Sequence, residues 1–571
     1  MSKYVIGLDF GTNSCRSLII DVANGNELAS HVFPYPSGKD GVIVDSADPN
    51  LARQNPADYV AGIEVAIGEA LKKAKRRQPN FSPRDVIGIG ADTTGSSPLP
   101  VDATGQPLCF DPKFKNNPAA LVWLWKDHTS YAEAAQITEL ASRMRPHYLA
   151  KIGGTYSSEW WWSKILHCKH VAKEVFDAAH SWVETCDWVP ALLVGELSPN
   201  KIKRSICAAG HKAMFSRSWH GLPEKEFLEA LSPGLGSLRD RLYEEAFTSD
   251  RLAGRLSKSW SDKLGLSPSV AVAVGAFDAH MGAVGAGISP GTLVKIIGTS
   301  TCDIMIHPHK EKLNDIPGVC GIVDGSVMDG YFGIEAGQSA VGDIFLWFVN
   351  ELVPERYGVT QDEKFKNLER AAAQLKPGES GLLALDWNNG NRTILVDVRL
   401  SGLLLGQTLH TEPHEIYRAL IEATGFGALA IIDRIEEYGV TVRQVVNCGG
   451  LAIKSPLLMQ IYADITGRPM KISHSEHTPA VGAGIFAAIA AGKKAGGYEY
   501  VIEAQQAMTR VGREFNPIPA HHETYKKLYG LYRQLHDGFG TREWSGGMHN
   551  VMKNLMTLRD QARGITEYSD N

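Results

Sequence analysis

The stretch from Ala273 to Cys302 combines a single carboxylate with a glycine-rich strand end. Asp278 is its only acidic residue and lies among Ala, Gly, Val, Phe and Met side chains, while the strand-like run 293–297 breaks into Gly298-Thr299-Ser300-Thr301. A carboxylate in such a run either holds a buried ion pair or acts as an acid or base. Backbone N–H groups and hydroxyls at a sharp turn can bind phosphate. Taken alone, so many small residues are more typical of close helix–sheet packing.

A proton acceptor and a phosphate-binding turn within one stretch are what phosphoryl transfer to a hydroxyl requires. The same pattern occurs near the N-terminus, where the strand ending at Phe10 breaks into Gly11-Thr12-Asn13 and continues to Cys15. A third strand end carries Gly449-Gly450. The repeat predicts a duplicated α/β fold whose two Gly-Thr loops face each other across a cleft.

Other polar side chains are weaker candidates. Hydroxyls at 93–97 follow a strand, which favours a ligand site or a plain Ser/Thr turn about equally. The small residues 208–210 predict a turn before Lys212, which is either a surface lysine or one aimed at the transferred phosphate or a substrate oxygen. The aromatic run 156–162 suits a sugar face or a domain interface. His167 and His170 are better explained by an amphipathic helix than by a metal, because no acidic partner lies nearby in the sequence.

Alternating strands and helices must position these groups. We predict strands at 4–10, 17–22 and 27–33 with a hairpin turn at Asn24-Gly25, a helix from Pro56 to about Arg77, and a strand at 86–92. In the second half we predict strands ending at Ile297, Cys448 and Ser473, and helices at about 455–466 and 480–491. Because the chain opens with a β-meander and has no GxGxxG or GxxxxGK[ST] there, a dinucleotide-binding or P-loop fold has no support.

Composition narrows the class of protein. The chain has 571 residues, which favours two large domains, and 57 of them are glycine. A net charge of −5 without a basic block argues against nucleic acid as a partner. No apolar run is long enough to span a membrane, and no signal peptide precedes the first strand, so we expect no membrane association. Eight scattered cysteines without a CxxC pair indicate a cytoplasmic protein.

Taken together, the motifs resemble those of the FGGY carbohydrate kinases, within the actin-like ATPase superfamily. The likeness extends from residue 3 to about 540, although 310–396 contributes no motif apart from the one at 335–344, and the tail after 540 matches nothing. The stretches 275–287 and 297–304 point to the branch that phosphorylates L-ribulose. The carrying stretches are 6–14, 90–98, 125–128, 152–160, 186–193, 209–212, 275–287, 297–304 and 335–344.

This resemblance implies two actin-like (ribonuclease H-like) α/β domains, at 1–288 and 289–540, with a tail at 541–571 and a central cleft between the domains. It implies ATP and Mg²⁺, with Asp278 as catalytic base and Asp9 holding the metal through water. Ser96, Lys212, Asp278 and Glu335 are the implied sugar contacts. The implied nucleotide contacts are Gly11, Thr12 and Asn13 in the first loop, Gly298, Thr299 and Ser300 in the second, and Gly449 and Gly450 on the adenosine side.

The sequence leaves several alternatives for the function. The substrate could be D-ribulose, a xylulose or a polyol. The sequence does not decide among them, because only a few contacts in the cleft distinguish the configuration of a single hydroxyl group. A nucleotide-driven conformational protein, like actin or the seventy-kilodalton chaperones, would keep the loops but needs no sugar pocket. A sugar sensor without catalysis would need Asp278 replaced. The expected partner is a small ketopentose, and a homodimer is the default expectation for the assembly.

Overall fold

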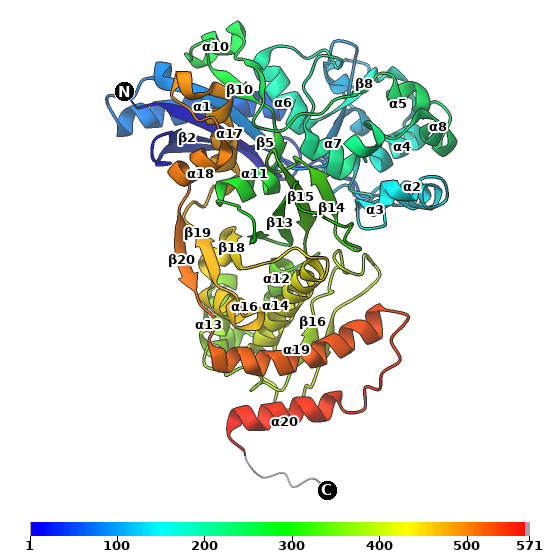
Figure 1. The fold of residues 1–571 in the computed structure, drawn as a ribbon, viewed down its shortest axis with the longest axis vertical. Coiled ribbons are helices and arrows are strands. Elements are labelled where there is room, and N and C mark those ends of the chain that lie inside the picture. The colour runs from blue at the N-terminus through cyan, green and yellow to red at the C-terminus, as the bar shows by residue number, and fades with distance from the viewer. Residues whose placement is uncertain (1, 566–571) are drawn as a thin grey trace.

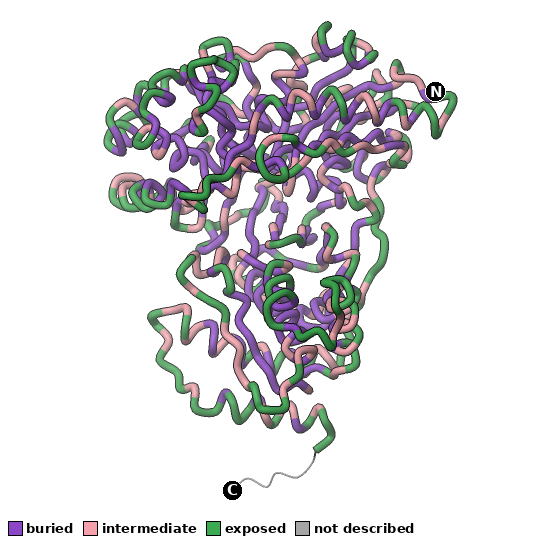
Figure 2. Tube along the Cα trace, turned by 180° about the vertical axis from the view of Figure 1, so that it is seen from behind, coloured by how far each residue is buried: buried purple, intermediate pink, exposed green. Residues whose placement is uncertain are grey.

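A computed structural model describes residues 2–565 and contains two seven-stranded sheets, one above the other in Figure 1. The first has the order β3-β2-β1-β5-β10-β9, with β11 also paired to β5. The second has the order β14-β15-β13-β12-β18-β19-β20. Buried residues concentrate in and around both sheets (Figure 2), so each sheet has its own core.

The first sheet opens with the predicted meander. β1 (Tyr4–Phe10), β2 (Ser14–Asp21) and β3 (Glu27–Pro34) are antiparallel, and β5 (Val86–Thr93) adds to β1 in parallel. Asp9 and Asp92 are register partners on β1 and β5. Two carboxylates are therefore brought side by side at the same end of the sheet. The sheet is completed by β9 (Leu252–Arg255), β10 (Ala271–Ala273) and β11 (Ala276–Phe277).

The second sheet repeats this arrangement, as the sequence predicted. β12 (Thr292–Ile297), β13 (Thr301–Pro308) and β15 (Tyr331–Ala336) are antiparallel, and β18 (Gln444–Cys448) adds to β12 in parallel. Each Gly-Thr loop thus joins the first two strands of its own sheet. The two-domain α/β fold is confirmed. The sheet is completed by β14 (Gly321–Asp324), β19 (Met470–Ser473) and β20 (Val511–Phe515).

Helices cover both faces of the first sheet. α1 (Pro56–Arg77) packs on β2 and β3, with Asn55 as its N-cap. The other face is covered by α17 (Thr478–Ala491), which comes from much later in the chain and lies beside the first sheet in Figure 1. A Cβ at Gly7 would come within 1.8 Å of the Ala480 carbonyl oxygen, and one at Gly90 within 2.0 Å of that of Ala483. Glycine is required at both positions because the α17 backbone packs directly against the backbone of the strands.

α11 (Asp278–Gly285) follows β11 and packs against α17 between the two sheets. Cβ atoms at Gly285 and Gly482 would lie 2.0 Å and 1.9 Å from carbonyl oxygens of the opposite helix. The small residues around Asp278 therefore do serve close packing, as one alternative held. They also hold the first residue of α11 at the junction of the domains.

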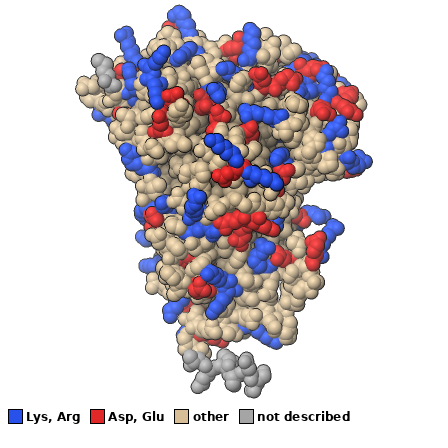
Figure 3. Space-filling model, viewed as in Figure 1, with Lys and Arg blue, Asp and Glu red and all other residues tan. Residues whose placement is uncertain are grey.

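Part of the segment after residue 540 forms a helix that packs on the second domain. α20 (Val551–Arg563) buries Leu555 in that domain's core, and Arg563 pairs with Glu415 at 3.0 Å. Within residues 2–565, no helix combines the length and the apolar character needed to cross a membrane. Positive and negative side chains are interspersed on the face shown in Figure 3.

The remaining helices are α2 (Tyr131–Met144), α3 (Pro146–Ala150), α4 (Trp161–Val171), α5 (Lys173–Ala178), α6 (Thr185–Val194), α7 (Ile206–Lys212), α8 (Lys225–Leu231), α9 (Leu235–Arg239), α10 (Lys258–Leu264), α12 (Gly342–Glu351), α13 (Gln361–Ala372), α14 (Pro413–Glu437), α15 (Gly450–Lys454), α16 (Pro456–Thr466), α18 (Val501–Met508) and α19 (Pro519–Gly540). Three two-stranded sheets pair β4 (Arg53–Gln54) with β7 (Val122–Trp123), β6 (Pro98–Val101) with β8 (Ser181–Glu184), and β16 (Leu383–Leu385) with β17 (Leu403–Leu405).

Candidate active site

A cavity of about 260 Å³ lies where the two domains meet. The first domain contributes Thr12, Thr94, Gly95, Trp125, Glu159, Lys212, Phe277, Asp278, Ala279 and His280, and the later part of the chain contributes Ile296, Gly298, Thr299, Ser300, Thr301, Cys302, Glu335, Arg392 and Pro479. Asp278, Lys212, Glu335, Thr12 and the second Gly-Thr loop are therefore brought together. An aromatic and polar wall of this size suits a small polar molecule.

Asp278 occupies the first position of α11 and is half-buried on the cavity wall. One carboxylate oxygen accepts a hydrogen bond of 2.7 Å from the Ala279 N–H. No lysine, arginine or histidine among residues 2–565 forms an ion pair with it, so the ion-pair alternative for this carboxylate is wrong. Burial, with repulsion from Asp9, raises its pKa to about 7. A carboxyl that titrates near neutrality is suited to accepting a proton.

Asp9 and Asp92 form an acidic pair next to Asp278. Burial raises the pKa of Asp92 well above its usual range, and the charges of Asp9 and Asp278 raise it further. Neither carboxylate oxygen of Asp92 has a hydrogen-bond partner among the described residues. Asp9 is paired with Arg16 at 3.0 Å. Buried, uncompensated carboxylate oxygens fit a hard divalent cation such as Mg²⁺, which binds oxygen ligands and retains water.

The two Gly-Thr loops are tight hairpins at the ends of β1 and β12. The Gly11 N–H donates to Ser14 O at 3.0 Å, and the Gly298 N–H donates to Ser300 O at 2.9 Å. The Thr12 hydroxyl accepts a 3.0 Å hydrogen bond from the Trp125 indole N–H. A Cβ at Gly298 would meet nothing within 4 Å. A ligand can therefore approach the second loop closely.

Four of the predicted nucleotide residues do not line this cavity, namely Gly11, Asn13, Gly449 and Gly450. Asn13 turns its side chain to Asp40 O, at 2.5 Å. Gly449 follows β18 with φ +93°, and a Cβ there would lie 2.4 Å from Ile297 O. A Cβ at Gly450, the first residue of α15, would meet nothing within 4 Å. The Gly-Gly turn thus lies against the end of β12, next to the second loop but outside the cavity. Gly11, in the first loop, does not line the cavity either.

Lys212 and Glu335 form a buried ion pair of 2.8 Å across the domain junction. The sequence predicted a turn before Lys212, and this is wrong: Lys212 is the last residue of α7. The small residues instead let α7 approach β14, because a Cβ at Gly210 would lie 2.2 Å from a Val323 methyl group. Burial alone would raise the pKa of Glu335, but Lys212 and two histidines hold it far below its usual range.

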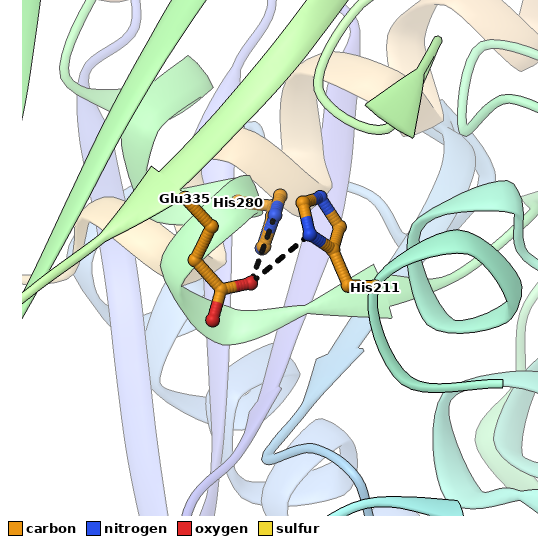
Figure 4. Close-up of side chains that lie close together, drawn as sticks. All are labelled: His211, His280 and Glu335. Carbon is orange, nitrogen blue, oxygen red and sulfur yellow. Dashed lines mark ion pairs between the residues drawn. The ribbon is translucent and has the colours of Figure 1, made fainter. Parts of the chain in front are cut away.

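Those two histidines, His211 on α7 and His280 on α11, face the second oxygen of Glu335 (Figure 4). His211 Nδ1 lies 3.3 Å from Glu335 Oε2, and His280 Nε2 lies 3.7 Å from it. Burial lowers the pKa of both imidazoles, that of His280 to about 4. These three residues form a cluster whose composition could also bind a metal ion.

Arg392 and Glu159 are site residues that sequence reasoning missed. Arg392 lies in the loop between β16 and β17, and Glu159 comes from the first domain. Their side chains approach to 3.5 Å across the cavity. The ionisation of Glu159 raises the pKa of Arg392, which stays charged. The sequence did not indicate a role for Arg392, because Arg392 lies in a loop and belongs to no recognised motif.

Ser96 lies behind the cavity wall, where Thr94 and Gly95 are the lining residues. Its hydroxyl donates a short hydrogen bond to Glu184, and its carbonyl accepts one of 2.8 Å from Lys164. Burial lowers the pKa of Lys164 to about 8 and raises that of Glu184 to about 7. This buried polar layer supports the residues that line the cavity.

The histidine pair 167/170 has an acidic partner after all. Both lie on α4, as the helical interpretation predicted, but their Nδ1 atoms lie 3.1 Å and 2.9 Å from the two oxygens of Glu133 on α2. The sequence separation of 34 residues between Glu133 and His167 concealed this contact. The group lies outside the cavity and joins two helices.

Comparison with known proteins agrees with this geometry. The profile of the "FGGY family of carbohydrate kinases, N-terminal domain" matches residues 4–285, and that of the C-terminal domain matches 293–491. The chain is 44% identical to "Ribulokinase" of Geobacillus thermodenitrificans over 99% of both chains, and 43% identical to "Ribulokinase" of Vibrio parahaemolyticus over 93% of this chain and 95% of that one. The solved structure of xylulose kinase from Rhodospirillum rubrum is similar in fold, with a TM-score of 0.75 at 20% identity over 94% of this chain and 99% of that one.

Proposed function

Because the chain belongs to the FGGY family of carbohydrate kinases, we propose that it transfers the γ-phosphoryl group of ATP to the terminal hydroxyl of L-ribulose, giving L-ribulose 5-phosphate and ADP in L-arabinose catabolism. The observation that carries the chemistry is Asp278, a carboxyl with a pKa near 7 on the wall of a cavity that also contains the second Gly-Thr loop. The choice of ribulose rests on relatives named ribulokinase that are 43–44% identical over nearly the whole chain.

In the proposed reaction Asp278 accepts the proton of the sugar hydroxyl as its oxygen attacks the γ-phosphorus. Gly11, Thr12 and Asn13 hold the phosphates from one side, and Gly298, Thr299 and Ser300 hold them from the other. Gly449 and Gly450 contact the adenosine side. Mg²⁺, when bound, neutralises charge on the phosphate oxygens, and Asp9, with Asp92 beside it, would hold the ion through water.

The sugar is held by Lys212 and Glu335 in this proposal, with Ser96 supporting the wall from behind. A buried ammonium–carboxylate pair presents both donors and acceptors to hydroxyl groups. Closure of the cavity between two domains excludes water, which would otherwise compete as phosphoryl acceptor. Eight unpaired cysteines fit a reducing cytoplasm.

The test is ADP release with MgATP and a panel of L-ribulose, D-ribulose, xylulose and ribitol. We expect the highest kcat/KM with L-ribulose and a steep rise in ATP turnover when it is added. Turnover that does not respond to any sugar would contradict the kinase and favour a nucleotide-driven conformational protein. A higher kcat/KM with another member of the panel would retain the kinase and replace the substrate.

A further inference from the structure

His280 is a cavity-lining residue that the proposed reaction does not use. It lies two positions after Asp278 on α11 and is only 2% exposed. Neither of its ring nitrogens has a hydrogen-bond partner among residues 2–565. Buried polar groups are nearly always paired, so a buried imidazole with two unpaired nitrogens beside a substrate cavity requires an explanation.

The surroundings of the ring indicate which nitrogen carries the proton. Nε2 lies 3.7 Å from Glu335 Oε2, too far for a hydrogen bond but close enough for strong electrostatics. Lys212 keeps Glu335 ionised. A carboxylate attracts an N–H and repels a lone pair, so the neutral ring carries its proton on Nε2. Nδ1 is then a hydrogen-bond acceptor.

We propose that Nδ1 of His280 accepts a hydrogen bond from a sugar hydroxyl other than the one that is phosphorylated, which makes His280 a specificity-determining residue. This inference rests on the proposed function. An acceptor cannot bind the ketose carbonyl, and Asp278 takes the reacting hydroxyl. A site built to bind a hydroxyl rejects the analogue that lacks it, because the buried acceptor is then left unpaired.

His211 supports this arrangement from outside the cavity. Its Nε2 lies 3.0 Å from the Ser326 hydroxyl, and its Nδ1 lies 3.3 Å from Glu335 Oε2. With its proton on Nδ1, His211 helps to fix the carboxylate that orients His280. The rings of His211 and His280 lie 4.5 Å apart.

A metal ion is the competing occupant of this cluster. The ligand atoms of His211, His280 and Glu335 all lie within 4.8 Å of one another. However, the ammonium of Lys212 lies 2.8 Å from the same carboxylate, and its positive charge opposes a divalent cation there. The sugar hydroxyl is therefore the occupant that the charges favour.

The experiment is a cycle between His280→Ala and single-deoxy analogues of L-ribulose, measured as kcat/KM with saturating ATP. For wild type we expect one analogue to lose roughly 5- to 100-fold, the range for one unpaired buried acceptor. His280→Ala should lose a similar factor with the full sugar and nothing further with that analogue. The other analogues should lose equal factors in both proteins, and the KM for ATP should stay unchanged.

Two further variants separate hydrogen bonding from structure. In His280→Asn the amide oxygen can stand in for Nδ1, so this variant should recover part of the discrimination even where His280→Ala folds poorly. His307→Ala is the matched control, because His307 is a buried histidine on β13, outside the cavity, whose Nε2 has no hydrogen-bond partner among the described residues. It should leave the pattern across the analogues unchanged.

The proposal would be overturned if His280→Ala lost the same factor in kcat/KM, relative to wild type, with every deoxy analogue. A Co²⁺ absorption band that wild type shows and His280→Ala lacks would also overturn it, by assigning the cluster to a cation. Failure of the proposed function is a different result, because the assay of wild type is sufficient to detect it. If the ketose panel selects another sugar, the cycle is run with its deoxy analogues. If no sugar is phosphorylated, both proposals fall.

Discussion

Replacing Asp278 by Asn should lower turnover sharply and stabilise the protein at the same time. The amide keeps the shape and can still accept the 2.7 Å hydrogen bond from the Ala279 N–H, but it cannot take a proton from the sugar. We expect kcat to fall roughly 10²- to 10⁴-fold, the usual contribution of a positioned acid or base. Binding of MgATP and ketose should change little.

The gain in stability follows from the pKa. Burial raises the pKa of Asp278 from 3.8 to about 7, so the folded state resists its ionisation. Each factor of ten in proton affinity corresponds to about 1.4 kcal/mol, and keeping Asp278 ionised at pH 8 therefore costs the fold up to about 4 kcal/mol. This cost is absent below about pH 3.8 and grows as the pH rises to about 7. The neutral amide avoids it at every pH.

Both quantities should be measured on one preparation, kcat by coupled ADP release and melting temperature by calorimetry at pH 8 and pH 5. The melting temperature of Asp278→Asn should exceed that of wild type at pH 8, and the difference should narrow at pH 5. Near-normal turnover would refute the role of Asp278 as base. A lower melting temperature at pH 8 would mean that the fold stabilises the charged carboxylate, contrary to the geometry described above.

Three other predictions concern the same cavity. In the free enzyme kcat/KM for the ketose should rise with pH up to about 7, because Asp278 must lose its proton to act as base, and a flat profile from pH 5.5 to 8 would contradict this. Lys212→Met should raise the KM for the sugar more than that for ATP, since it removes the charge 2.8 Å from Glu335; unchanged sugar kinetics would leave Lys212 a purely structural residue. Ketose and nucleotide together should compact the protein in small-angle scattering more than either alone, whereas superimposable curves would exclude closure.

The parts of the site that could be predicted from the sequence are those carried by local patterns. A strand followed by Gly-Thr can be recognised within about a dozen consecutive residues. The same holds for Asp278, a single acidic residue among small ones. Asp92 could also have been found. It is the last residue but one of a buried strand, just as Asp9 is, and parallel neighbours place equivalent residues side by side.

The contacts that were missed join residues far apart in the chain. Glu159 and Arg392 meet at 3.5 Å although 233 positions separate them, and the loop that carries Arg392 has no periodicity to mark it. The segment before Lys212 is a helix and not the predicted turn, because its small residues allow close packing against β14 and do not reverse the chain. Pairing and packing of this kind depend on the tertiary fold, which local propensity does not encode.

The position of α17 has a consequence for synthesis of the chain on the ribosome. The last strand residue of the first sheet is Phe277, yet the helix that covers one face of that sheet ends at Ala491. At 5–20 residues per second, roughly 10–40 s pass between the two. Throughout this interval the glycine-lined surface of β1 and β5 has no helix to bury it. The nascent first domain therefore exposes a defined apolar surface, which is buried only after the chain has been synthesised as far as Ala491.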